Sequence, residues 1–403
     1  MQRFSFLQLL RNLGPGIITA ALVFGPGSLT VASKLGAGFG YQLLWVIPLA
    51  LVFMSVFTQM SARIGLASQQ SLISLATEHY GRWVAILTGI GTFLVTAAFQ
   101  AGNSIGAGIA FGELFHTSAT PFVLAFSALA IGLLFFPGFY KVLEKVMIFL
   151  VGTMLLAFLI TVFVAQPAVG EMLHGLFVPR LPEGSVLLVA AITASSFSIV
   201  GAFYQSYLVR AKGWDISQKK TATGEALTGI IILGLISIMV MAAAGAVLQP
   251  QGIEVKTATD MGRALEPLFG SFTKVVFMFG LFGASFSSLL GNATIGGSIL
   301  AETLGIKEGF HRPGVRICIT VVIVMGAATA LIFGRLPLEM IVFAQAVTIY
   351  LAPMIGLVIF LIANKKQVMG ELANSRTQNI LGAIGLLILA ILAANNLRVI
   401  VWG

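Results

Sequence analysis

The tetrapeptide Gly25-Pro26-Gly27-Ser28 interrupts the first apolar stretch of the chain, which runs from residue 13 to residue 35. Proline has no backbone N–H and glycine is conformationally loose, so we expect two half-helices joined by open backbone. The second half-helix would begin with N–H groups that have no intrahelical acceptor, beside the Ser28 hydroxyl. Such groups can bind a small ion, whereas the alternative is a simple proline kink.

A second polar stretch, residues 193–206, lies in another apolar segment, where a scaffold helix would carry leucine. It includes Ser195, Ser196, Ser198 and Gly201. Small residues at this depth either let helices pack closely or accompany an unwound segment with exposed N–H and C=O groups. We predict the second case, in which these four residues and the tetrapeptide form one substrate site.

Further polar side chains inside apolar segments are candidates for a substrate pathway or for coupling. They are Gln100, Asn103, Tyr204, Gln205 and Gln345. At this depth a polar group either bonds a neighbouring helix or lines a pathway. The four histidines lie in or beside polar connections, and the single cysteine has no disulfide partner within the chain. We therefore expect no metal site built on histidine or cysteine, no cofactor and no catalytic constellation, so the chain is not expected to be an enzyme.

The composition defines the elements that must position these residues. Hydrophobic residues make up 58% of the chain and charged residues 9%, whereas about a quarter of a soluble domain is charged. An all-α integral membrane protein with one transmembrane domain over residues 1–403 is therefore expected. Apolar runs of about 20 residues predict eleven spans. They cover residues 13–34, 41–62, 83–112, 121–137, 143–165, 185–209, 226–248, 271–300, 313–334, 337–363 and 378–401.

The basic residues predict the orientation. Of the 23 Lys and Arg residues, 16 fall on the side of the N-terminus. Because basic residues collect on the cytoplasmic side, we expect a cytoplasmic N-terminus and an external C-terminus in the cell (inner) membrane. This asymmetry explains the net charge of +9, so the lipid bilayer is an expected partner and nucleic acid is not. The oligomeric state is left open.

Spans one and six occupy equivalent places in two groups of five spans. Residues 13–165 would form the first group, residues 185–363 the second, and residues 378–401 one extra helix. This pattern is typical of an inverted repeat in which two broken helices face each other at the bilayer midplane.

Several motifs along nearly the whole chain resemble the Nramp family of divalent-metal transporters. They are Gly14-Pro15-Gly16 with the tetrapeptide, residues 40–46, residues 63–66, residues 283–288 with 297–302, and residues 344–347 with Pro353. The chain is similar to a divergent prokaryotic-type member. The resemblance implies a LeuT-type fold of five plus five helices with spans one and six broken, one extra helix, and secondary transport by alternating access.

The chain departs from this family at the metal ligands. Members bind a transition metal through an aspartate and an asparagine of the first helix and a methionine and a carbonyl of the sixth. Here Gly25 and Ser28 stand at the first two positions, and Ser198 and Ser195 at the other two. In addition, Val200 and Gln205 stand at two histidine positions, and Gln100 and Asn103 at acidic positions associated with proton transfer.

These departures change the expected substrate. A dehydrated divalent cation needs anionic or soft ligands at this depth. The second half-helices would instead present positive dipole ends, near residues 27–29 and 201–203. We therefore expect the substrate to be a small inorganic oxyanion such as bicarbonate, held by Ser28, Ser195, Ser198 and backbone N–H groups.

The alternatives are a divalent cation (hydrated Mg²⁺ or Mn²⁺), a small neutral or zwitterionic solute, and a non-transporting membrane receptor. Hydroxyl and carbonyl oxygens could hold a hydrated Mg²⁺ ion. Co-transport of Na⁺ or H⁺ is left open.

Overall fold

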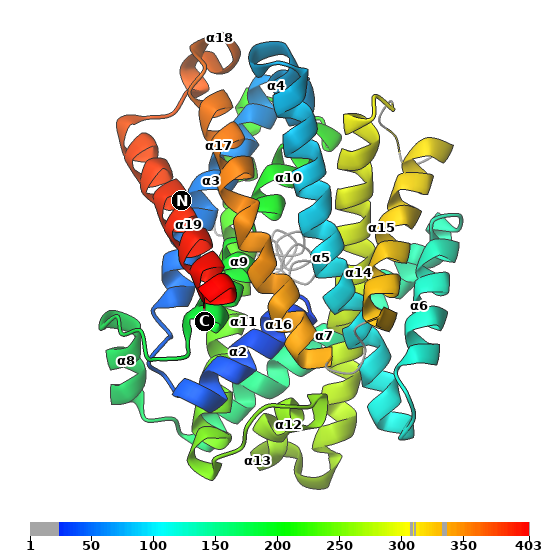
Figure 1. Ribbon diagram of the computed structural model, residues 1–403, viewed down its shortest axis with the longest axis vertical. Coiled ribbons are helices and arrows are strands. Elements are labelled where there is room, and N and C mark those ends of the chain that lie inside the picture. The colour runs from blue at the N-terminus through cyan, green and yellow to red at the C-terminus, as the bar shows by residue number, and fades with distance from the viewer. Residues whose placement is uncertain (1–23, 307–308, 310–311, 333–336, 403) are drawn as a thin grey trace, which may run out of the picture.

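The computed structural model describes residues 24–306, 309, 312–332 and 337–402, and the regular elements in these ranges are all helices. Most of them lie side by side along the long axis of the molecule (Figure 1). The longer helices are α2 (Pro26–Phe39), α3 (Val46–Ala67), α5 (Arg82–Phe115), α6 (Thr120–Leu133), α7 (Pro137–Ala165), α9 (Val186–Phe197), α10 (Ile199–Ala211), α11 (Lys219–Val247), α14 (Thr273–Thr303), α15 (Pro313–Ile332), α16 (Pro337–Val347), α17 (Ala352–Ala363) and α19 (Arg376–Trp402). The shorter ones are α4 (Leu72–Tyr80), α8 (Val169–Phe177), α12 (Ala258–Gly262), α13 (Glu266–Phe269) and α18 (Lys366–Met369).

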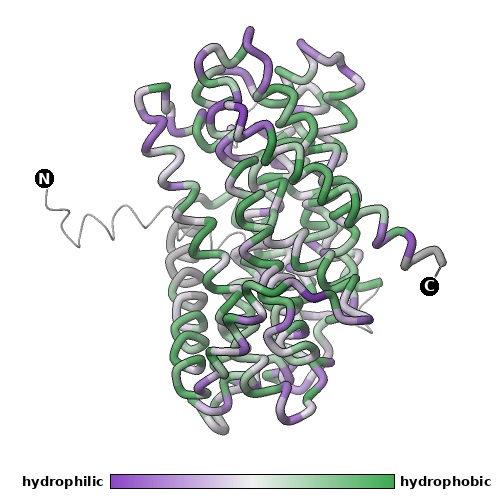
Figure 2. The backbone as a smooth tube through the Cα atoms, turned by 90° about the vertical axis from the view of Figure 1, so that its left-hand side faces the viewer, coloured by the Kyte–Doolittle hydropathy of each residue, from purple (hydrophilic) through white to green (hydrophobic). Residues whose placement is uncertain are grey.

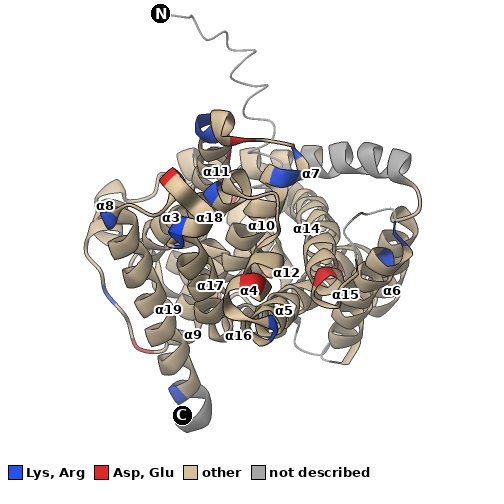
Figure 3. Ribbon diagram, turned by 90° about the horizontal axis from the view of Figure 1, so that it is seen from above, with Lys and Arg blue, Asp and Glu red and all other residues tan. Residues whose placement is uncertain are grey.

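The distribution of polarity fits a bilayer. Many hydrophilic residues lie toward the two ends of the molecule, and hydrophobic residues dominate between them (Figure 2). Helices α4 and α18 mark one end, and α12 and α13 the other (Figure 1). Seen from above, the ribbon carries Lys, Arg, Asp and Glu residues at scattered places, and most of it is uncharged (Figure 3). The expectation of an all-helical integral membrane protein is therefore confirmed.

Nine membrane spans are the most that length and composition support among the described helices. Seven helices are long and apolar enough to cross a membrane, and two bent pairs raise the number to nine. Helix α6 has 14 residues, about 21 Å at 1.5 Å per residue, so it is shorter than a hydrocarbon core of about 30 Å. The first half of predicted span one, residues 13–23, lies outside the described residues. The number of eleven spans and the two-repeat division stay predictions.

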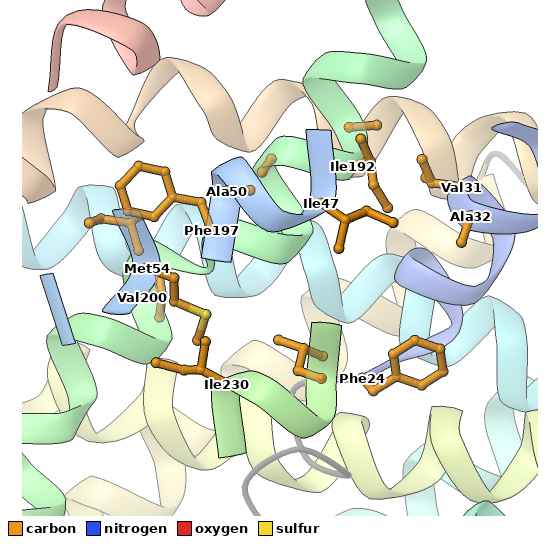
Figure 4. Packing of buried hydrophobic residues seen from close by; sticks show 14 of the residues in the cluster. Phe24, Val31, Ala32, Ile47, Ala50, Met54, Ile192, Phe197, Val200 and Ile230 are labelled. Carbon is orange, nitrogen blue, oxygen red and sulfur yellow. The ribbon is translucent and has the colours of Figure 1, made fainter. Parts of the chain in front are cut away.

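The long helices pack in two groups. Helix α14 packs mainly against α5 and α15, whereas α10 packs against α3, and α11 against α2 and α3. Close approach of α2 and α11 depends on Gly36, where a Cβ atom would lie 2.3 Å from the Met241 carbonyl oxygen. Buried side chains such as Ile47, Met54 and Val200 fill the space within the second group (Figure 4). Few contacts join α2 or α10 to α5 and α14, and the candidate site lies between these helices.

Candidate substrate cavity

A cavity of about 40 Å³ lies where the start of α2, the α9–α10 junction, α5, α14 and α16 meet. We call it the polar cavity. Its walls are formed by Gly25, Ser28, Phe99, Asn103, Ser195, Ser198, Val200, Gly201, Asn292, Ile295 and Gln345. One water molecule needs about 10–15 Å³ on this measure, so the polar cavity holds an object of only a few heavy atoms.

The start of α2 forms one wall. Gly25 is the N-cap residue and Pro26 is the first helical residue. The Leu29 N–H donates to the Gly25 carbonyl at 3.3 Å, so the N–H groups of Gly27 and Ser28 precede the first intrahelical bond. Proline is well suited to this place because it has no N–H to leave unpaired. The Ser28 side chain is 3% exposed and lines the cavity.

The α9–α10 junction forms another wall. Ser198 has left-handed backbone angles, φ 39° and ψ 60°, which interrupt the helix between Phe197 and Ile199. The Ser198 N–H still donates to the Ala194 carbonyl at 3.2 Å, and the Ala202 N–H donates to the Ser198 carbonyl at 2.9 Å. The interruption is local, since residues 186–211 continue as one apolar stretch.

At both helix starts, the N–H groups without an intrahelical acceptor end one or two residues earlier than the sequence suggested. The N–H groups without an intrahelical acceptor belong to residues 27–28 and 199–201, because the N–H groups of Leu29 and Ala202 close the first turns. The expected ranges, 27–29 and 201–203, were therefore wrong by one or two residues. The positive ends of the α2 and α10 dipoles still border the same cavity.

Two amide side chains on α5 form a hydrogen-bonded relay. Gln100 Nε2 donates to the Leu289 carbonyl of α14 at 3.0 Å. Asn103 Nδ2 donates to Gln100 Oε1 at 3.3 Å. A Cβ atom at Gly25 would lie 3.1 Å from Asn103 Oδ1 and 3.0 Å from Ser288 Oγ. Side chains from α5 and α14 therefore occupy the space that a larger residue at position 25 would need.

Gln345 of α16 covers the start of α2. A Cβ atom at Gly27 would lie 1.7 Å from Gln345 Nε2, so glycine is what allows this amide to approach the backbone. Gln345 is 6% exposed, and its Oε1 atom has no hydrogen-bond partner among the described residues. The cavity wall thus contains an unsatisfied amide oxygen, which a ligand or water could satisfy.

The structure brings together seven of the thirteen predicted residues. Those that line the polar cavity are Gly25, Ser28, Asn103, Ser195, Ser198, Gly201 and Gln345. Pro26, Gly27, Ser196, Gln100 and Gln205 do not line it, and Tyr204 lines a second cavity. Helical spacing explains why Ser195 and Ser198 line the cavity and Ser196 does not. Residues three apart share a helix face, whereas the adjacent Ser196 points elsewhere. Gln100 does not line the cavity but is hydrogen-bonded to Asn103, which does.

Four lining residues were missed: Phe99, Val200, Asn292 and Ile295. Asn292 belongs to the polar series of α14 that includes Ser285 and Ser288, so the polarity of this span was a usable signal. Which face of α14 meets the cavity depends on its packing against α5. Phe99 and Ile295 gave no signal, because apolar residues are ordinary in a membrane span.

No lining residue of the polar cavity carries an ionisable side chain. Residues 13–23, which precede the described part of this wall, also contain no Asp, Glu, His, Lys or Arg in the sequence. In the described part of the chain, no group of three or more His, Cys, Asp or Glu side chains is placed to hold a metal ion. Hydroxyls, amides and backbone groups are what the cavity offers to a substrate.

A second cavity of about 330 Å³ lies toward the α4 end, and we call it the end cavity. Its walls include Gln69, Tyr204, Tyr207, Arg210 and Ser298. The Tyr204 and Tyr207 rings stack with centroids 5.7 Å apart. Arg210 Nε donates to the Gln69 carbonyl at 3.0 Å, and its guanidinium lies 5.7 Å from the Tyr207 ring centroid.

A carboxylate at the end of α14 joins three helices beside the end cavity. Tyr207 of α10 donates to Glu302 Oε2 at 2.5 Å. The Ser71 and Ser74 hydroxyls at the start of α4 donate to Glu302 Oε1. The Tyr207 bond crosses between the helix group of α10 and that of α14, whereas α4 packs on α5 in the α14 group.

Two solved structures that share this fold are described as transporters. A manganese transporter of Eremococcus coleocola, in complex with an aromatic bis-isothiourea substituted compound, aligns with 98% of this chain and 87% of its own, with a TM-score of 0.74 and 18% identity. Mhp1, a nucleobase-cation-symport-1 family transporter, aligns over 96% of this chain and 92% of its own, with a TM-score of 0.66 and 12% identity. The arrangement of helices is thus that of the LeuT-type transporters.

Sequence comparison then defines the family. The family described as natural resistance-associated macrophage protein-like, Nramp, matches residues 16–398. The chain belongs to this family, so the resemblance in the motifs is confirmed. Divalent metal cation transporter MntH of Yersinia pestis is 26% identical over 385 residues, 94% of this chain and 92% of the relative. MntH of Klebsiella pneumoniae is 26% identical over 393 residues, 96% and 93% of the two chains. These relatives are transporters, consistent with a protein that is not an enzyme.

Proposed function

We propose that this chain is a secondary transporter that carries a small inorganic oxyanion, with bicarbonate as the best candidate, by alternating access. The observation that carries the proposal is the meeting of two helix starts at one uncharged cavity. Ser28 at the start of α2 and Ser198, Val200 and Gly201 at the start of α10 line a space of about 40 Å³. The N–H groups of residues 28, 200 and 201 have no intrahelical acceptor. Backbone N–H groups at a helix start favour an anion through both hydrogen bonds and the dipole.

The size and polarity of the polar cavity support a small monoanion. Bicarbonate has four heavy atoms, which matches a space for about three water molecules. An anion there would meet fixed dipoles in place of a cationic side chain. A cationic side chain in the cavity would cost several kcal/mol of desolvation whenever no anion was bound beside it.

Divalent-cation transport is the second candidate, and the comparisons favour it more directly than they favour an anion. The relatives are named divalent metal cation transporters, and one structural neighbour is a manganese transporter. Asn103, Asn292 and Gln345 would supply amide oxygens to a largely hydrated Mg²⁺ or Mn²⁺ ion. The residues at the family's ligand positions argue against this candidate. None of them has a carboxylate or a thioether: they are Gly25, Ser28, Ser195 and Ser198.

Transport in proteoliposomes separates the two candidates. The full chain is reconstituted with a pH indicator inside the vesicles, and bicarbonate, MnCl₂ or MgCl₂ is applied outside. We expect a bicarbonate-dependent change of internal pH without Mn²⁺ or Mg²⁺ entry. Saturable divalent-cation entry with no effect of bicarbonate would overturn the anion proposal, and absence of both fluxes would favour the non-transporting receptor. Varying Na⁺ and H⁺ gradients in the same vesicles identifies the coupling ion.

A further inference from the structure

Asn103 contributes to the polar cavity an amide oxygen that, like the unsatisfied Gln345 Oε1 atom, does not suit a bare anion. Its side chain is 3% exposed and lines the cavity. The orientation of its amide is set by the relay that begins at Leu289. The Leu289 carbonyl can only accept, so the group of Gln100 that faces it at 3.0 Å must be the Nε2 donor.

The relay then fixes Asn103. With Nε2 engaged, Gln100 presents Oε1, which can only accept, to Asn103 at 3.3 Å. Asn103 must therefore direct its NH₂ group toward Gln100 and its Oδ1 atom away from it. This oxygen faces Gly25, since a Cβ atom there would lie 3.1 Å from it. No donor reaches Asn103 Oδ1 among the described residues.

Ser195 adds a second acceptor. Its hydroxyl donates to the Ile192 carbonyl at 3.1 Å, so the lone pairs of Oγ are what it can offer to the polar cavity. The donors lie at the two helix starts and at Ser28 and Ser198. The cavity thus has donors at its helix starts together with the Asn103 Oδ1 acceptor, whose orientation the relay fixes and which no donor reaches in the described part of the chain.

We infer that Asn103, held by Gln100, is a specificity-determining residue that selects an oxyanion carrying one hydroxyl group over an oxyanion without a proton. The inference rests on the proposed anion transport. A protonated monoanion such as bicarbonate can accept from the helix starts and donate its one proton to Asn103 Oδ1. A planar anion of the same charge and size without a proton, such as nitrate, would place an oxygen lone pair against that atom.

Competition between these two anions tests the inference. Bicarbonate-driven internal pH change is measured in proteoliposomes of the full chain, with increasing nitrate as competitor. A hydrogen bond to a charged ligand changes affinity by about tenfold or more, so wild type should prefer bicarbonate over nitrate by at least about tenfold. In N103L, which removes the amide at similar size, the preference should fall to within about threefold.

A matched control and a second variant distinguish a loss of selectivity from misfolding of N103L. Ser104 is the next residue on α5, is 1% exposed, does not line the cavity, and its Oγ has no partner among the described residues. S104A should therefore keep the wild-type preference. Q100M keeps Asn103 but removes the relay, so the amide can turn and the preference should again fall.

Each outcome bears on one of the two claims. Equal competition by nitrate in wild type, or an unchanged preference in both N103L and Q100M, overturns the role of Asn103 while anion transport stands. Mn²⁺ or Mg²⁺ entry with no bicarbonate-dependent signal overturns the proposed function itself, and the role of Asn103 with it.

Discussion

The polar cavity and the end cavity are built partly on the same two helices, yet they differ in size and charge. Helices α10 and α14 supply Val200, Gly201 and Asn292 to the polar cavity of about 40 Å³. Further along, they supply Tyr207 and Ser298 to the end cavity of about 330 Å³. Among the described residues, the charged side chains of Arg210 and the nearby Glu302 lie beside the end cavity, and none lines the polar cavity.

This difference separates two tasks. In a small cavity inside the membrane, an unpaired charged side chain would be costly, so fixed backbone dipoles must supply the potential for an ion. A wide cavity at the membrane end can admit a hydrated ion, and its charges can be solvated. We therefore expect changes in the polar cavity to alter substrate selection, and changes in the end cavity to alter the transport rate with little effect on selection.

Placing a carboxylate in the polar cavity should have the largest effect. S28D puts a negative charge beside the start of α2, where like charges about 4 Å apart repel by about 4 kcal/mol at an effective dielectric of 20. Bicarbonate transport should fall by at least about a hundredfold. The new carboxylate should also allow weak binding of divalent cations. Bicarbonate-driven pH change in proteoliposomes and Mn²⁺ titration of the purified protein measure both effects.

S28A is the control for this change. It loses one hydroxyl but adds no charge, so transport should fall by only about tenfold. Equal transport by wild type and S28D would mean that the helix starts do not hold the substrate.

Filling the space at Gly27 tests the wall made by Gln345. In G27V the new side chain would displace the Gln345 amide, whose Nε2 lies 1.7 Å from the Cβ position, and transport should fall by more than about tenfold. The double variant G27A/Q345A removes the clash. It should transport no worse than Q345A alone, whereas additive losses would show that the clash is not the cause.

Part of the polar cavity could be predicted from the sequence. The tetrapeptide at residues 25–28 and the small residues of the sixth span identified both helix starts, because proline and glycine act locally. Gln345 was recognised by its depth in an apolar span. These signals depend on residue type and need no knowledge of packing.

The rest depends on how the helices pack. The left-handed residue is Ser198, and a non-glycine residue rarely adopts this conformation. The sequence could not single it out among several serines. Similarly, Tyr204 and Gln205 are neighbours in the sequence, but Tyr204 lines the end cavity and Gln205 lines neither of the two cavities. The rotation of α10 and α14 about their axes is a tertiary property, so the number of polar residues in a span does not determine it.

Ser198 allows function and stability to be changed in opposite directions. Both S198A and S198G remove a hydroxyl from the polar cavity, so transport should fall by about tenfold in each. Glycine also relieves the left-handed strain, worth about 1 kcal/mol, so S198G should unfold at a higher temperature than S198A. Thermal unfolding of the purified variants checks this order, and a lower melting temperature for S198G would argue against the left-handed junction.

The smallest effect is expected at the end cavity. Y207F removes the 2.5 Å bond to Glu302 and leaves the ring in place. The transport rate should change by about threefold, while the preference for bicarbonate over nitrate stays at the wild-type value. Nitrate competition in proteoliposomes measures both quantities. A loss of preference in Y207F would contradict the division of tasks between the two cavities.

Uptake of radiolabelled bicarbonate and radiolabelled manganese, measured side by side in the same proteoliposomes, tests most directly whether the uncharged polar cavity carries an anion. The account predicts saturable bicarbonate uptake that S28D abolishes, and no manganese uptake above that of protein-free vesicles. Saturable manganese uptake by wild type, with bicarbonate at the level of protein-free vesicles, would contradict it.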